Sequence, residues 1–88
     1  MSISSKYEEI QQCLNNDKNR EKYQKMRSKK ETTKEENLFL MAIDNLEDCV
    51  KKLKTDGNFN EVESSLLITT SNMWIRRITQ YLIDENWM

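Results

Sequence analysis

Apolar residues recur at helical spacing in three stretches of this 88-residue chain. At about 100° per residue, the members of each stretch fall on one side of a helix, which is typical of helices that pack against one another. The first stripe consists of Tyr7, Ile10 and Leu14. The second consists of Leu38, Ala42, Leu46, Cys49, Val50 and Leu53. The third consists of Leu67, Trp74, Ile75, Ile78, Tyr81 and Leu82, with the small polar residue Ser71 on the same face. We therefore expect an all-α helical bundle with these residues as its core.

Capping signals predict where these helices begin and end. A capping box is present at residues 5–8 and again at residues 33–36, and Asn60 with Glu63 forms a similar pair. Asp56 and Gly57 predict the end of the central helix, because glycine adopts the left-handed conformation without strain. The sequence has no proline and one glycine, which favours a few long helices. The three main predicted helices span residues 5–15, 33–54 and 60–86.

The run of residues 38–43 is apolar all round, so a helix through it has no polar side. A short buried strand is an alternative for such a run. Polar residues flank it, however, and the helical pattern continues beyond it. We interpret the run as part of a helix that packs on two sides, either between neighbouring helices or against a partner. Leu40 and Met41 are therefore candidate partner-binding residues.

The segment of residues 17–34 is strongly basic in a chain that is nearly neutral overall. It contains eight basic and three acidic residues, whereas the whole chain has a net charge of −1. A helix through this segment would align four lysines in one stripe, which could bind phosphates or an acidic protein surface. A solvated lysine-rich face is the alternative. The candidate anion-binding residues are Lys18, Lys22, Lys25, Lys29, Arg20 and Arg27.

The basic segment has few apolar residues to anchor it. Tyr23 and Met26 are out of phase with the apolar stripe of the first helix, so a break is predicted at residues 15–19, which are turn-prone. Two apolar side chains hold a helix only weakly. Within a single domain of residues 1–88, we therefore expect residues 16–32 to form either a short, loosely held basic helix or a partly disordered connector.

The composition argues against most catalytic and metal chemistry. The sequence has no histidine, the commonest general base and zinc ligand. Its single glycine cannot build a phosphate-binding glycine loop. Residues 56–60 resemble the start of a calcium loop, but Glu61 and Leu67 stand where such a loop needs glycine and a bidentate glutamate. We expect no enzymatic activity, no metal and no cofactor.

The same composition bears on cellular location. The sequence begins without the apolar run of a signal peptide, and no stretch approaches the roughly 20 apolar residues of a membrane span. Cys13 and Cys49 are then expected to be free thiols. We predict a cytoplasmic protein that does not insert into membranes.

The last predicted helix carries a candidate interface near its C-terminal end. Arg76, Gln80, Ile83 and Trp87 follow one another at steps of three or four residues on the side away from the predicted core. Tryptophan and arginine often dominate the binding energy of protein interfaces. The sequence leaves a second arrangement open, in which the last turn folds back and Trp87 lies beneath the first helix.

These features indicate a small non-catalytic protein that binds another macromolecule. We favour a protein partner, with this chain acting as an inhibitor, adaptor or assembly subunit, and a homodimer also fits the surplus of apolar surface. A nucleic-acid-binding regulator that uses residues 18–30 is the alternative. The abundance of Lys, Asn and Ile suits an AT-rich genome. A phage- or plasmid-borne inhibitor of a host complex would match this size and composition.

Overall fold

The computed structural model describes residues 3–55 and 60–88, and these residues form four helices joined by short connections. The helices are α1 (Ile3–Asn15), α2 (Arg20–Ser28), α3 (Lys34–Thr55) and α4 (Glu61–Asp84). The predicted all-α bundle is therefore confirmed. The basic segment supplies the short fourth helix, α2, and the apolar run 38–43 lies within α3 rather than in a strand.

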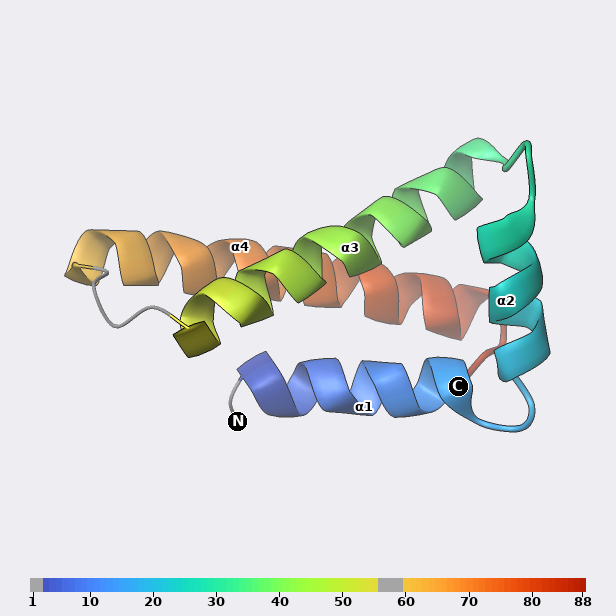
Figure 1. Ribbon diagram of the computed structural model, residues 1–88, viewed down its shortest axis with the longest axis horizontal. Helices are drawn as coiled ribbons and strands as arrows, with labels where there is room; N and C mark the ends of the chain where they lie inside the picture. Colours follow the sequence, from blue (N-terminus) through green and yellow to red (C-terminus); the bar gives the residue numbers. More distant parts are fainter. Residues whose placement is uncertain (1–2, 56–59) are drawn as a thin grey trace.

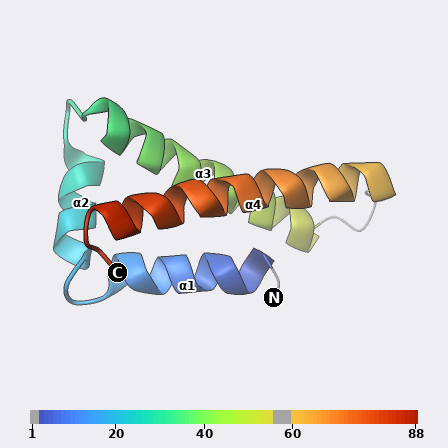
Figure 2. The same cartoon turned by 180° about the vertical axis from the view of Figure 1, so that it is seen from behind.

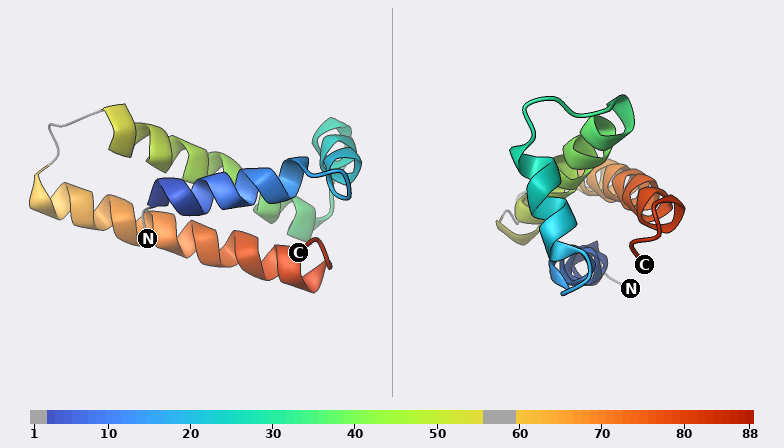
Figure 3. Two further views of the ribbon diagram at one scale, coloured as in Figure 1. Left: turned by 90° about the horizontal axis from the view of Figure 1, so that it is seen from below. Right: turned by 90° about the vertical axis from the view of Figure 1, so that its right-hand side faces the viewer.

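The three longer helices run up, down and up, and α2 lies across one end of them (Figure 1; Figure 3, right). Helices α3 and α4 form the most extensive helix pair, and α1 packs against both. Seen from below, α1 lies over the seam between α3 and α4 (Figure 3, left). Seen from behind, α1 lies alongside the C-terminal part of α4 (Figure 2). Because α1 has 13 residues and α4 has 24, α1 covers only part of the α3–α4 pair.

The core fills the space between α1, α3 and α4 at the end that α2 covers. Most members of the predicted apolar stripes are buried there, Leu46, Ile78 and Leu82 completely. Leu38 is an exception, because its side chain is 42% exposed, and its place in the predicted core is wrong. The buried neighbours of that turn are Phe39 and Ile43. Because these two large side chains pack into the core, α3 is oriented so that Leu38 lies outside the buried side. The buried apolar cluster consists of Ile10, Leu14, Met26, Phe39, Ala42, Ile43, Leu46, Val50, Ile78, Leu82 and Trp87.

Two of the three predicted helix starts are confirmed by their hydrogen bonds. At the start of α3, the Glu36 amide donates to Thr33 Oγ1 (3.1 Å) and the Thr33 amide donates to Glu36 Oε1 (2.9 Å), a complete capping box. At the start of α4, the Glu63 amide donates to Asn60 Oδ1 (2.8 Å). The predicted stop at Asp56 and Gly57 lies outside the described residues.

The predicted start of the first helix is wrong by two residues. Helix α1 begins at Ile3, so Ser5 lies inside it and cannot be its N-cap. Ile3 packs against the core cluster, in line with Tyr7, Ile10 and Leu14 at i+4, i+7 and i+11. Burial of this additional side chain favours the longer helix.

The end of α4 also differs from the prediction, and Trp87 therefore does not lie on the helix. The helix ends at Asp84, and Asn86 has a positive φ of 62°. The Trp87 amide donates to the Leu82 carbonyl (2.7 Å) and the Asn86 amide to the Ile83 carbonyl (3.1 Å). These two bonds form a Schellman motif, which reverses the chain after the helix.

Trp87 is consequently buried rather than exposed on the outer side of α4. Its ring makes edge contacts with Phe39 (5.7 Å between centroids) and Tyr81 (6.2 Å). The predicted placement of Trp87 in an outward interface is therefore wrong, and the fold-back alternative describes it. The prediction from helical periodicity placed Trp87 on the wrong side because it relied on a helix that continues through Asn86.

Candidate protein-binding groove

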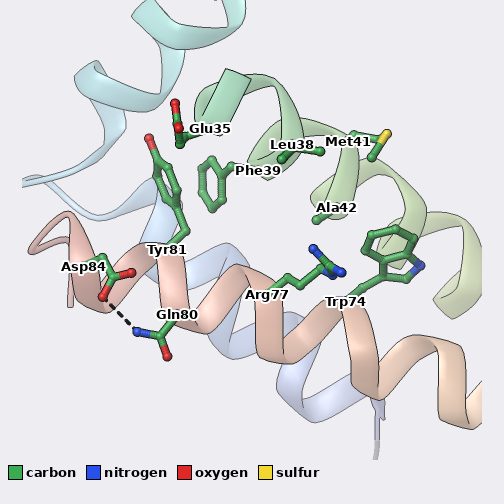
Figure 4. A pocket seen from close by; sticks show the side chains of 10 residues that line it. All are labelled: Glu35, Leu38, Phe39, Met41, Ala42, Trp74, Arg77, Gln80, Tyr81 and Asp84. Atoms are coloured by element: carbon green, nitrogen blue, oxygen red, sulfur yellow. Dashed lines mark hydrogen bonds between the residues drawn. The ribbon is translucent and has the colours of Figure 1, made fainter. Parts of the chain in front are cut away.

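An open groove follows the seam between α3 and α4, and residues of these two helices alone line it. Its volume is about 480 Å³, and Figure 4 labels its lining side chains. The groove lies on the side of the seam that α1 leaves uncovered. We call this feature the α3–α4 groove. The groove stays open because α1 can cover only one side of the seam between two helices.

The floor of the groove is aromatic and its α3 wall is aliphatic. Phe39 and Tyr81 stack at 4.0 Å between ring centroids with their planes 16° apart. Leu38 and Met41 project from α3 one turn apart, and each is 42% exposed. Trp74, which is half-buried, supplies the facing wall from α4. The lining therefore consists of a flat aromatic floor and three apolar side chains, Leu38, Met41 and Trp74, on the walls.

Charged groups stand at the rim of the groove. Arg77 follows Trp74 by one turn and makes no ion pair or hydrogen bond with any residue that the structure describes. At the end nearest Tyr81, Glu35 lies on α3, and Gln80 Nε2 donates to Asp84 Oδ1 (2.8 Å) on α4 (Figure 4). The rim thus presents one unpaired cation beside the apolar wall and acidic groups at one end.

Tyr81 keeps its phenolic proton in this setting. Burial of the ring is the main cause that raises the pKa of Tyr81, and the nearby carboxylates of Glu85, Glu36 and Glu35 raise it further. The hydroxyl therefore remains a hydrogen-bond donor at the end of the groove throughout the neutral range.

A second hollow of about 540 Å³ continues along the same seam on the far side of Trp74. Leu66, Leu67 and Thr70 of α4 line it together with Cys49 of α3. Leu66 is strongly exposed, whereas Cys49 is buried. The two hollows share Trp74, and Asn45, Asp48, Lys52 and Glu63 complete the lining of the second one.

The structure separates the residues that the sequence predicted as one partner-binding set. Met41 and Gln80 line the groove. Leu40 instead packs against the core cluster, and Arg76 and Ile83 are exposed on α4 outside the groove. The sequence analysis missed Leu38, Trp74 and Arg77 as site residues. It had assigned Leu38 and Trp74 to the core because both lie on the predicted apolar stripes.

The predicted anion-binding residues lie on or beside α2, and most are engaged within the chain. Lys22 Nζ lies 4.9 Å from the centre of the Trp87 ring, a cation–π contact. Lys18 precedes α2, so it is not part of a helical stripe with the other lysines. The ion pairs are Arg20–Asp17 (3.2 Å), Lys25–Glu21 (3.3 Å), Arg27–Asp44 (2.8 Å) and Lys29–Glu36 (2.9 Å).

Within residues 3–55 and 60–88, no three Cys, Asp or Glu side chains come together in a way that could hold a metal ion. Cys13 and Cys49 are free thiols. None of the helices in the described part of the chain has both the length and the apolar character needed to cross a bilayer.

No protein-family model, curated protein or solved structure matches this chain significantly.

Proposed function

We propose that this protein is a non-catalytic binding module that accepts an amphipathic helix of a partner protein in the α3–α4 groove. The observation that carries the proposal is the pair Leu38 and Met41. Both remain 42% exposed on a wall beside the aromatic floor, in a small protein with a limited core. Contiguous exposed apolar surface of this kind is typical of interaction sites.

The geometry suits a helix as the occupant. An amphipathic helix binds a groove through apolar side chains at i, i+3, i+4 and i+7. Leu38, Met41 and Trp74 would contact that apolar face, and the Phe39–Tyr81 stack would lie beneath it. Tryptophan at the centre of such a site commonly contributes a large share of the binding energy.

Charge complementarity indicates the chemistry of the partner. Arg77 has no partner among the described residues and stands beside the apolar wall, so a carboxylate on the bound helix would pair with it. The partner is therefore an apolar helix that carries an acidic residue at the edge of its apolar face. Such binding would suit an inhibitor, an adaptor or an assembly subunit, including a phage- or plasmid-borne inhibitor of a host complex.

Nucleic acid is a less favoured partner. Arg20, Lys25, Arg27 and Lys29 each have an acidic partner within the chain, and Lys22 lies over Trp87. Phosphate binding gains its free energy by releasing counterions from cations placed along a backbone. Here it would first have to replace these intramolecular contacts, although exposed ion pairs are individually weak.

Photocrosslinking from inside the groove tests the proposal. Purified protein with a benzoylphenylalanine at Met41 is irradiated in native lysate, with and without nuclease, and the same residue at the exposed Asp17 is the matched control. We expect a discrete protein adduct from position 41 that is absent at position 17. The substitution Leu38→Asp, which changes the groove wall, should abolish the adduct without lowering the melting temperature appreciably.

Three results would contradict the proposal. Equal labelling from positions 41 and 17 would show that the groove is not a specific site. Persistence of the adduct in Leu38→Asp would show that the groove wall does not bind the partner. Loss of the adduct on nuclease treatment would favour the nucleic-acid alternative.

A further inference from the structure

The side of α4 that faces away from the core carries an unexpected amount of apolar surface. Val62 is 68% exposed, Leu66 63% and Met73 41%. With Thr69 they follow one another at steps of four, three and four residues, the spacing of a coiled-coil seam. Arg76 and Gln80 continue the same spacing. We call these six residues, 62, 66, 69, 73, 76 and 80, the outer stripe of α4.

No other described helix covers the apolar half of this stripe. The beginning of α4 extends past the N-terminal end of α1 (Figures 1 and 3). The packing of α3 and α1 against α4 buries Ser71, Ile78 and Leu82 on the opposite side, and Leu66, which also borders the second hollow of the α3–α4 seam, stays exposed. Together the three exposed apolar side chains present a patch that a monomer of this size does not need for its own core.

The charged residues beside the outer stripe are arranged so that one copy of the helix is complementary in charge to a second copy. Glu63, Thr70 and Arg77 lie seven residues apart and therefore occupy one flank of the seam. If two copies of α4 run antiparallel about a twofold axis at Thr70, Glu63 of each copy lies opposite Arg77 of the other. The same pairing brings Leu66 of one copy to within about one residue's rise of Met73 of the other. In a parallel arrangement the two Arg76 side chains would face each other and Arg77 would have no acidic partner.

We propose that the protein forms a homodimer in which the outer stripes of two α4 helices pack antiparallel about a twofold axis at Thr70. The contact is isologous, so one surface serves both copies. Arg77, which lacks a partner within the described chain, gains one in the dimer. A single pair of helices buries an area at the small end of specific interfaces, so the dimer is weak and forms at micromolar or higher protein concentrations. This association goes beyond the partner binding proposed above.

The dimer predicts a concentration-dependent sedimentation coefficient and a specific pattern of substitutions. Sedimentation velocity over the micromolar to submillimolar range should show a shift from monomer to dimer in the parent. Leu66→Asp and Met73→Asp should each weaken association by roughly tenfold or more, because each buries a carboxylate in the seam. Ile83→Asp is the matched control on the same helix. Its counterpart in the pairing lies outside α4, so association should stay at the parent level.

Charge exchange and crosslinking test the orientation. Glu63→Arg and Arg77→Glu should each weaken the dimer, and the double variant should restore it. Because the twofold axis passes through Thr70, Thr70→Cys should form an intermolecular disulfide under mild oxidation far faster than Asn72→Cys. The parent, with its two native thiols, is the blank.

The proposal is wrong if the parent stays monomeric at every concentration, or if Ile83→Asp disrupts association as strongly as Leu66→Asp. Failure of the double charge exchange to restore the dimer, or equal crosslinking at positions 70 and 72, would overturn the antiparallel arrangement. Leu38 lies outside the outer stripe, so Leu38→Asp affects groove binding and leaves dimerisation unchanged. Arg77 takes part in both proposals, so the variants that separate them are Leu38→Asp for the groove and Leu66→Asp for the dimer.

Discussion

Asn19 Nδ2 donates a 2.6 Å hydrogen bond to the carbonyl of Trp87 and so joins the start of α2 to the chain that follows α4. The same nitrogen donates to the Cys13 carbonyl (3.0 Å), one of the carbonyls left unpaired at the end of α1. Asn19 is completely buried. One amide group therefore holds the ends of three elements together, and Asn16 Oδ1 fixes its backbone by accepting from the Asn19 amide (2.8 Å).

Removal of the side-chain amide of Asn19 should lower the stability of the fold considerably. We expect Asn19→Ala to lower the free energy of unfolding by about 2–3 kcal/mol, because the buried Trp87 carbonyl loses its short hydrogen bond and the part-buried Cys13 carbonyl loses its side-chain donor. Urea denaturation measures the change. Asn15→Ala is the matched control, since its side chain bonds only to the Gln11 carbonyl on an exposed surface. A cost for Asn19→Ala no larger than that for Asn15→Ala would contradict the role of this contact.

Trp87 should behave as a core residue. Trp87→Ala should cost about 3–5 kcal/mol of unfolding free energy, the range for a large buried aromatic side chain. Ile83 lies on the last turn of α4 and is 57% exposed, so Ile83→Ala should cost less than about 1 kcal/mol. Thermal melts of the two variants compare the positions directly. Similar melting temperatures would show that the fold-back of Trp87 contributes little.

Asn86 has the left-handed backbone conformation that reverses the chain. Asn86→Gly should therefore be neutral or slightly stabilising, because glycine reaches this conformation without a Cβ clash. Asn86→Ala should cost about 1–2 kcal/mol. The difference between these two variants, measured by urea denaturation, isolates the backbone effect from the loss of the amide. Equal stability of the two would contradict the Schellman turn.

The capping box of α3 should make stability depend on pH. The hydrogen bond from the Thr33 amide is the main cause that lowers the pKa of Glu36 below its ordinary 4.5, and Lys29 contributes next. A carboxyl with a lowered folded-state pKa stabilises the fold above its ordinary pKa, and this stabilisation is lost as the pH falls through the folded-state value. Stability should therefore decline on acidification from pH about 5.

Glu36→Gln should show a smaller decline over the same acid range, because it can retain the capping hydrogen bond without titrating. Lys29→Ala should keep most of the decline, since the bond from the Thr33 amide remains. Urea denaturation at a series of pH values measures all three proteins. A decline in Glu36→Gln as steep as that of the parent would assign the effect to other groups.

Helix α2 should be the least protected helix of the bundle. Met26 is its one fully buried apolar side chain, and its ion pairs with α3 lie at an exposed surface. We expect the amides of residues 22–29 to exchange with solvent hydrogen faster than those of residues 46–53. Hydrogen exchange resolved by residue measures this. Equal protection would mean that Asn19 and the Arg27–Asp44 pair hold α2 as firmly as a core helix.

The sequence by itself determined the features that depend on neighbours within a few turns of helix. The capping partners Thr33–Glu36 and Asn60–Glu63 are three residues apart, so their bonds form as soon as the helix does. Helical periodicity likewise placed Leu46 and Ile78 in the core, because residues near the middle of a buried side stay buried when the helix turns slightly.

Tertiary structure decided the features at the edges of those patterns. Leu38 lies at the edge of the buried side of α3, and only the contacts of Phe39 determine that Leu38 lines a groove instead. Trp87 is buried because Asn86 turns the chain and Asn19, 68 positions away in sequence, binds the Trp87 carbonyl. The groove exists because α1 packs on one side of the α3–α4 seam and leaves the other side open. Each of these outcomes depends on the packing of elements distant in sequence, which periodicity within one helix does not encode.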